Sequence, residues 1–236
     1  MANYTLLELV QQVTGELGVN RPSFVVGNND PQIVQFLALV NRLGRDIAKQ
    51  YEWQRLNKEF SVTTVQGTPT YALPSDWLYQ INQTEWDRTS RWPLIGPATT
   101  QEWQIYKSAI ISEGPNLRFR IANGFLEVDP PTGGLDLSFF YVSRNWIDGA
   151  DGLGYDKFQA DGDRSVFDDS LMVTGLKAQW KASKGLDGTF DAAEFRTMLD
   201  TIKAQDKGAQ KLSLGGFPRN ILLTQWNISD GNWPSN

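Results

Sequence analysis

The hydrophobic periodicity of this chain changes twice along its length, and these changes limit the folds that it can adopt. Apolar residues recur at helical spacing up to residue 51, alternate with polar residues from about residue 56, and return to helical spacing near residue 168. Helices at the two ends of a chain most simply pack on each other. We therefore predict an α+β fold with a helical bundle formed by the N- and C-terminal helices (residues 1–55 and 166–211), an inserted small antiparallel β domain (56–165) and an extended C-terminal tail (212–236).

Capping signals predict where the helices begin. Thr5 and Glu8 have the spacing of a capping box, in which each side chain accepts a hydrogen bond from a backbone N–H at the start of the helix. Asp30 followed by Pro31 is typical of a helix start, because proline lacks an N–H that would be unpaired there anyway. Asp168 or its neighbour is expected to cap the first helix of the C-terminal pair.

Turn signals predict hairpins in the middle of the chain. In "LRFRIANGFLEVDP", two alternating strands flank Asn123 and Gly124, a dipeptide that tolerates the positive φ angles of a type I′ turn. Residues 83–104 are expected to form two short strands around a turn at residues 87–90. A short helix ending at Ser108 should follow them, capped by Thr99 or Thr100.

The composition excludes several kinds of chemistry. The chain contains no histidine and no cysteine, which rules out imidazole relays, thiolate nucleophiles and metal sites built on these residues. Carboxylate, lysine or tyrosine chemistry remains possible. The net charge of −5 argues against a protein that wraps nucleic acid with a basic surface. No stretch approaches the roughly 18 apolar residues of a membrane span, so we expect no membrane partner.

One stretch, residues 83–104, combines aromatic and acidic residues in a way that has two interpretations. Trp86, Trp92 and Trp103 could stack on a sugar while Glu85 and Asp87 act as an acid and base pair. However, any strand with alternating polar residues places such carboxylates on one side, so a solvated strand face, or one turned to a neighbouring subunit, is favoured. The tryptophans are then expected to hold the β domain together or to form a subunit interface.

Acidic residues gather between residues 147 and 169, where seven aspartates and two basic residues give a charge equal to that of the whole chain. A calcium loop beginning at Asp161 would need glycine at its sixth position and glutamate at its twelfth, where Val166 and Met172 stand instead. We expect no metal and no cofactor. A solvated connection between sheet and helix is the favoured interpretation.

The residues after Lys211 are too apolar for a solvated terminus. They either fold back on their own bundle or dock on a partner, since exposed apolar surface usually marks a docking site. The large apolar residues concerned are Phe217, Ile221, Leu222, Leu223, Trp226 and Trp233.

Several segments in a fixed order resemble one known family. They are "TLLELVQQVTGELG", "NRLGRDIAKQYEWQ", "GTPTYALPSDW", "TEWDRTSRWPLIGPATTQEWQ", "FRIANGFLEVDPP" and "FDDSLMVTGLKAQWKASKGLD". The similarity runs from residue 5 to about residue 210. This series resembles the head-to-tail adaptors of tailed bacteriophages, the group that includes podophage tail tubular proteins and related connectors. The resemblance implies a non-enzymatic virion protein at the neck of the particle, assembled in the cytoplasm of the bacterial host.

The resemblance also implies partners and roles for residues. It implies a ring of twelve copies beneath the portal protein and above the next tail component, a nozzle, tube or terminator. The apolar residues of the tail would bind the portal, and the three tryptophans would include a subunit interface. Double-stranded DNA would pass through the lumen, during ejection, without specific binding. The aspartates expected to line this channel are Asp148, Asp151, Asp156, Asp161 and Asp163.

Two alternatives to the adaptor remain. One is a carbohydrate-binding or glycosidase-like β module on a helical scaffold, using the tryptophans and carboxylates of residues 83–104. The other is a different tail-tube or baseplate component of the same kind of particle.

Overall fold

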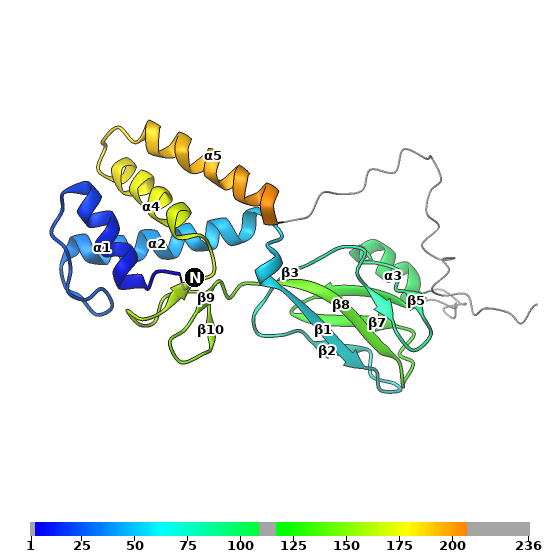
Figure 1. Cartoon of the computed structure of the whole chain (residues 1–236). Helices are drawn as coiled ribbons and strands as arrows, with labels where there is room; N and C mark the ends of the chain where they lie inside the picture. Colours follow the sequence, from blue (N-terminus) through cyan, green and yellow to red (C-terminus); the bar gives the residue numbers. More distant parts are fainter. Residues whose placement is uncertain (1–2, 109–116, 207–236) are drawn as a thin grey trace, which may run out of the picture. The chain divides into compact units, whose positions relative to one another are not determined.

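The computed structural model describes residues 3–108 and 117–206, and it divides into two compact units (Figure 1). Of the described residues, the first unit contains those up to 57 and those from 142 to 206, and the second contains those between 58 and 141. Helices together with small antiparallel sheets confirm the predicted α+β class. The segment 142–165, which we expected in the β domain, belongs to the helical unit. The expected tail at 212–236 lies outside the described residues.

Four helices form the first unit, as far as the described residues show: α1 (Leu6–Leu17), α2 (Pro31–Gln50), α4 (Asp169–Ser183) and α5 (Thr189–Asp206). Helix α4 contacts the other three, so it is the centre of the unit, and the N-terminal helices α1 and α2 pack against the C-terminal helix α4 as expected (Figure 1). The Phe36 ring of α2 stacks on Trp180 of α4 with the ring centroids 5.7 Å apart. None of the described helices is long and apolar enough to cross a membrane.

The predicted caps are present. The Thr5 hydroxyl accepts the Glu8 N–H at the start of α1 while the Glu8 carboxylate accepts the Thr5 N–H, which completes the capping box. Asp30 accepts the Gln32 N–H at the start of α2, and Asp168 accepts the Leu171 N–H at the start of α4. These helix starts are therefore determined by short-range sequence.

Residues 142–165 are held against the helices by Trp146, which is fully buried. Its ring lies against Gly44 of α2 so closely that a Cβ built on Gly44 would come within 2.2 Å of it. The indole Nε1 donates to the Asp156 carbonyl at 3.0 Å, and Phe158 and Phe167 pack on the ring with centroids 5.3 and 6.0 Å away. This segment carries the small sheet β10–β9–β11 (Gly154–Tyr155, Ile147–Asp148 and Arg164–Ser165). The indole thus anchors the segment on α2.

An ionic cluster connects three helices of the same unit. Asp191 of α5 is 3% exposed and forms ion pairs with Lys181 and Lys177 of α4, and Lys177 also pairs with Glu16 of α1 at 2.7 Å. Burial by itself would raise the pKa of Asp191, but the two lysines outweigh it and hold the pKa below its ordinary value. The hydrogen bond from Lys177 lowers the pKa of Glu16 in the same way.

The described residues of the second unit contain two sheets. One has the order β1–β8–β4–β5, with β3 also pairing with β8, and the other has the order β2–β7–β6. The strands of the first sheet are β1 (Asn57–Thr63), β3 (Trp77–Gln80), β4 (Trp86–Asp87), β5 (Trp92–Pro93) and β8 (Asp136–Ser143). Those of the second are β2 (Thr70–Ala72), β6 (Arg118–Ala122) and β7 (Phe125–Asp129). A 3-10 turn (Gln54–Leu56) precedes β1, and helix α3 (Thr100–Ser108) follows β5.

Both sheets contribute to one core in this unit. Its buried residues are Leu94, Leu117, Phe119, Leu126, Val128, Leu137 and Phe139. The β6–β7 hairpin turns at Asn123 and Gly124 with φ angles of 53° and 79°, as the dipeptide predicted. The predicted cap of α3 is also present, since Thr99 and Glu102 exchange hydrogen bonds with each other's backbone N–H groups. Ile95, just after β5, forms a β-bridge with Arg118 of this hairpin.

We expect Gly44→Ala to destabilise the helical unit. A methyl group at this position overlaps the Trp146 ring, and overpacking of this kind costs roughly 1–3 kcal/mol, more than the up to about 1 kcal/mol that alanine gains over glycine inside a helix. Thermal unfolding followed by far-UV circular dichroism measures the change. The control is Gly15→Ala in α1, where no atom lies within 4 Å of the added Cβ and a small gain in stability is expected. Equal stability of the two variants would contradict the packing argument.

We expect Asp191→Asn to lower the free energy of unfolding at pH 7 by about 2–3 kcal/mol, because two lysines lose their shared carboxylate while remaining partly buried. The wild-type contribution is present above the ordinary aspartate pKa and is lost as pH falls through the lower folded-state value. The difference between the two proteins in urea titrations should therefore shrink on acidification below about pH 4. Asp200→Asn, at an exposed position of α5, is the control and should change stability by less than about 0.5 kcal/mol.

Candidate functional site

The short hairpin β4–β5 forms the wall of a pocket in the second unit. Trp86 pairs with Pro93 and Asp87 pairs with Trp92, so each strand has only two residues before the chain bends away. Beyond the paired residues, the segments 82–85 and 94–97 diverge and enclose a pocket of about 460 Å³. Its lining residues are Asn82, Gln83, Glu85, Trp86, Pro93, Leu94, Gly96 and Pro97.

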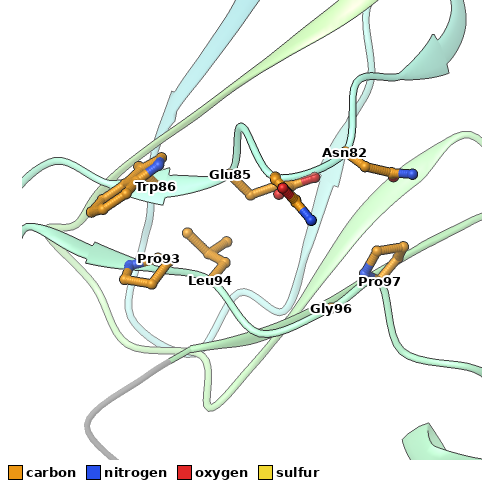
Figure 2. Close-up of a pocket in the computed structure, with 8 residues that line it drawn as sticks. Asn82, Glu85, Trp86, Pro93, Leu94, Gly96 and Pro97 are labelled. Atoms are coloured by element: carbon orange, nitrogen blue, oxygen red, sulfur yellow. The ribbon is translucent and has the colours of Figure 1, made fainter. Parts of the chain in front are cut away.

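The pocket has walls of apolar and amide side chains and one ionisable group. Glu85 and Leu94 point into the space between the two segments, with Trp86 and Pro93 at one end and Asn82 and Pro97 at the other (Figure 2). The Leu94 N–H donates to the Glu85 carbonyl at 3.1 Å, which fixes the two segments opposite each other. The backbone therefore places the Glu85 carboxylate at the pocket wall.

Burial of Glu85 contradicts the expectation of a solvated strand face, which was wrong for this residue. Its side chain is 5% exposed, and its Oε1 atom has no hydrogen-bond partner in the described part of the chain. Burial raises the pKa of Glu85, and nearby backbone N–H groups of residues 83–85 offset this effect only in part. The carboxylate is thus held in an environment that disfavours its charged form.

Asp87 is also 5% exposed, so the expectation of a solvated face was wrong for it as well. Its Oδ1 accepts the Thr89 N–H at 2.9 Å, which closes the turn after β4, and the next residue, Arg88, forms an ion pair with Glu59. Asp87 does not line the pocket, whereas Glu85 does. The acid and base pair of the glycosidase hypothesis is therefore not assembled around this pocket.

The three tryptophans differ in exposure. Trp103 of α3 is 3% exposed and lies beneath Arg120 and Lys107, which are 4.9 and 5.3 Å from its ring centroid. It packs inside its own unit, which accords with the expected structural role and removes it from the expected subunit interface. Trp86 and Trp92 are half-buried, so part of each indole remains at the surface.

Two of the aspartates expected to line a channel instead hold loops together. Asp163 is 2% exposed, and its carboxylate accepts the N–H groups of Ala150, Gln159 and Ala160. The Asp161 carboxylate accepts the N–H groups of Val25 and Val26 at 2.7–3.2 Å. Burial excludes Asp163 from a channel wall, and Asp161 already has backbone partners for its charge.

The remaining three aspartates lie nearer the surface. Asp148 on β9 is exposed, and Asp156 is half-buried. Asp151 is exposed, and a hydrogen bond from the Tyr155 hydroxyl lowers its pKa. The six apolar residues expected to bind a portal, from Phe217 to Trp233, lie outside the described residues, so their role stays a prediction. Within the described ranges, no cluster of acidic residues forms a metal site.

Three features of the structure had no signal in the sequence. These are the pocket beside Glu85, the contact of Trp146 with Gly44, and the lysine pair at Asp191. Each depends on contacts between different elements or on how the chain bends after a short strand. The local periodicity of the sequence predicts neither of these.

The fold is that of an α+β protein in which many of the described acidic and aromatic side chains hold loops, turns and helices in place. The family model of the SU10 adaptor protein matches residues 4–213. The chain therefore belongs to the SU10 adaptor family, a family of phage head-tail adaptors, and the resemblance seen in the sequence is confirmed. This family comprises structural proteins of phages and is not a family of enzymes. No curated protein matches the chain.

We expect Glu85→Gln to stabilise the isolated protein at neutral pH, because it removes a buried charge while keeping the shape of the side chain. The gain should be on the order of 1 kcal/mol. Since the folded-state pKa of Glu85 is raised, wild-type stability falls as pH rises from the ordinary glutamate value through the folded-state value. The advantage of the variant in urea titrations should therefore be larger at pH 7 than at pH 4.

Glu102→Gln is the matched control and should have the opposite sign. The hydrogen bond from the Thr99 N–H lowers the pKa of Glu102, so its contribution to stability is present above the ordinary glutamate pKa and is lost in acid. At pH 7 this variant should be less stable than the wild type. A loss of stability in both variants would contradict the assignment of Glu85 as a buried carboxylate with one unpaired oxygen.

Proposed function

We propose that this protein is a head-to-tail adaptor that forms a ring under the portal, links the capsid to the tail and lets DNA pass. The observation that carries the proposal is the match of the SU10 adaptor family over residues 4–213, nearly the whole chain. A ring of twelve copies would bind the portal on one side and the next tail component on the other. Its place would be the neck of the virion, after assembly in the cytoplasm of the host.

The charge of the chain supports passage of DNA without binding. A net charge of −5 offers few of the clustered cations that release counterions from DNA and hold it. Among the five aspartates expected at the channel, Asp148 and Asp151 are exposed and are the best candidates to face the lumen. Their role would be to repel the phosphate backbone weakly as it slides past.

The C-terminal residues supply the proposed portal contact. Residues 217–233 contain six large apolar side chains, more than a solvated terminus would carry. Docking of this segment on the portal would bury these side chains in each copy around the ring, so that many identical contacts act together. The adaptor would then bind as a complete ring at the portal.

Removal of residues 216–236 should abolish binding to the portal while leaving the helical unit folded. The measurement is co-sedimentation of the adaptor with purified portal rings, followed by electron microscopy of the complexes, with circular dichroism to check the fold. A narrower variant, Leu222→Ala with Leu223→Ala, should weaken binding because it removes apolar area only.

The matched control is Asn220→Ala with Ser229→Ala, which changes polar residues of the same segment and should bind as the wild type does. Undiminished binding by the truncated protein would refute the docking role of the tail. Failure of the full chain to bind portal rings would refute the adaptor proposal itself.

A further inference from the structure

The Glu85 carboxylate lies at the wall of the pocket formed by residues 82–97, and only part of its hydrogen-bonding capacity is satisfied. Its side chain is 95% buried, and its Oε1 has no hydrogen-bond partner among the described residues. A buried polar atom without a partner costs about 1–3 kcal/mol, and a charged one costs more. A site that carries this cost in the isolated chain gains most from a ligand that brings a positive charge to the carboxylate.

The walls of the pocket suit an arginine. Trp86, Pro93 and Leu94 offer apolar and aromatic surface, which packs against the stem and the flat face of a guanidinium while its N–H groups reach a carboxylate. The same unit already stacks arginines in this manner, with Arg118 placed 4.3 Å from the Tyr106 ring centroid and Arg120 similarly over a tryptophan. A volume of about 460 Å³ admits a long side chain.

A suitable arginine lies at the other end of the same hairpin. Arg91 occupies the turn between β4 and β5, is exposed and has a φ angle of 60°, and its side chain makes no hydrogen bond or ion pair with the described residues. The pair Asp87–Trp92 separates this turn from the open end that forms the pocket. Donor and acceptor therefore lie at opposite ends of one short element.

We propose that Arg91 of one copy inserts into the Glu85 pocket of the next copy and pairs with its carboxylate. A contact between two different ends of the same element is head-to-tail, and such contacts close into a ring when the rotation between copies permits. The inference rests on the proposed ring and names the residues that join its subunits. The half-exposed part of Trp86 would be covered in the contact.

Site-directed disulfides test this contact directly, because the chain has no cysteine of its own. Asn82→Cys places a thiol at the rim of the pocket, and Ser90→Cys places one beside Arg91; both positions are exposed. The two full-length variants are mixed and oxidised under two conditions, alone at high concentration and bound to portal rings. Each mixture should yield a disulfide-linked dimer. Each variant oxidised by itself should yield none, and the double variant should yield a ladder of multimers. Lys157→Cys in place of Ser90→Cys is the control for random collision.

Substitutions at the two charged residues identify the pair. Adding Glu85→Gln to the pocket variant, or Arg91→Gln to its partner, should reduce the yield of dimer about tenfold or more, and Arg91→Lys should retain part of it. Since Glu85→Gln is expected to stabilise the isolated chain, its loss of cross-linking cannot be attributed to unfolding.

Rings that assemble on the portal without the Asn82→Cys to Ser90→Cys cross-link would overturn this inference and leave the adaptor function intact. Cross-linking that is insensitive to Glu85→Gln and Arg91→Gln would also overturn it. Conversely, a charge-dependent cross-link in the isolated chain that binds no portal would support the contact and refute the adaptor function.

Discussion

The contact between Trp146 and Gly44 is the interaction on which the helical unit depends. The indole occupies space that any other residue at position 44 would fill, and its N–H is paired with the Asp156 carbonyl. It thereby fixes the segment 142–165 on α2. This segment in turn holds the start of α1. The Asp163 carbonyl accepts the Leu6 N–H, and the Asp161 carbonyl accepts the Leu7 N–H. A tryptophan outside the helices thus determines where the first helix begins in space.

The same contact explains why the domain boundary was only partly predictable. The sequence places the change from strands to helices near residue 166, because helical periodicity resumes there. In the structure the chain returns to the helical unit at residue 142, with several short strands still to come. Periodicity reports the type of an element, whereas domain membership depends on which surface buries it. Trp146 and Ile147 are both fully buried in the helical unit and so determine that this segment belongs to it. Nothing in their local sequence distinguishes them from residues of a sheet core.

Features that depend on neighbouring residues were predictable. The capping box of Thr5 and Glu8, the start of α2 at Asp30 and the turn at Asn123 each depend on bonds or φ angles within a few residues. The candidate site was not predictable in this way. Glu85 and Asp87 follow a strand-like alternation, which predicts that both point to the solvent-facing side of a strand. However, β4 has only two residues, so this strand does not define such a side. Both carboxylates are buried by the bends on either side and by the neighbouring segments.

Comparison with two other buried carboxylates shows how Glu85 differs in its hydrogen-bond partners. Asp163 is as deeply buried as Glu85, yet it accepts three backbone N–H groups, and Asp191 is balanced by two lysines. In both cases the fold provides partners within a single copy, and the charge stabilises a loop or a helix contact. Glu85 is the exception among these three, since one of its oxygens has no partner in the described chain. A fold that pairs Asp163 and Asp191 internally leaves one Glu85 oxygen, at the wall of a pocket, open to a partner outside the chain, as expected of a residue at an assembly contact.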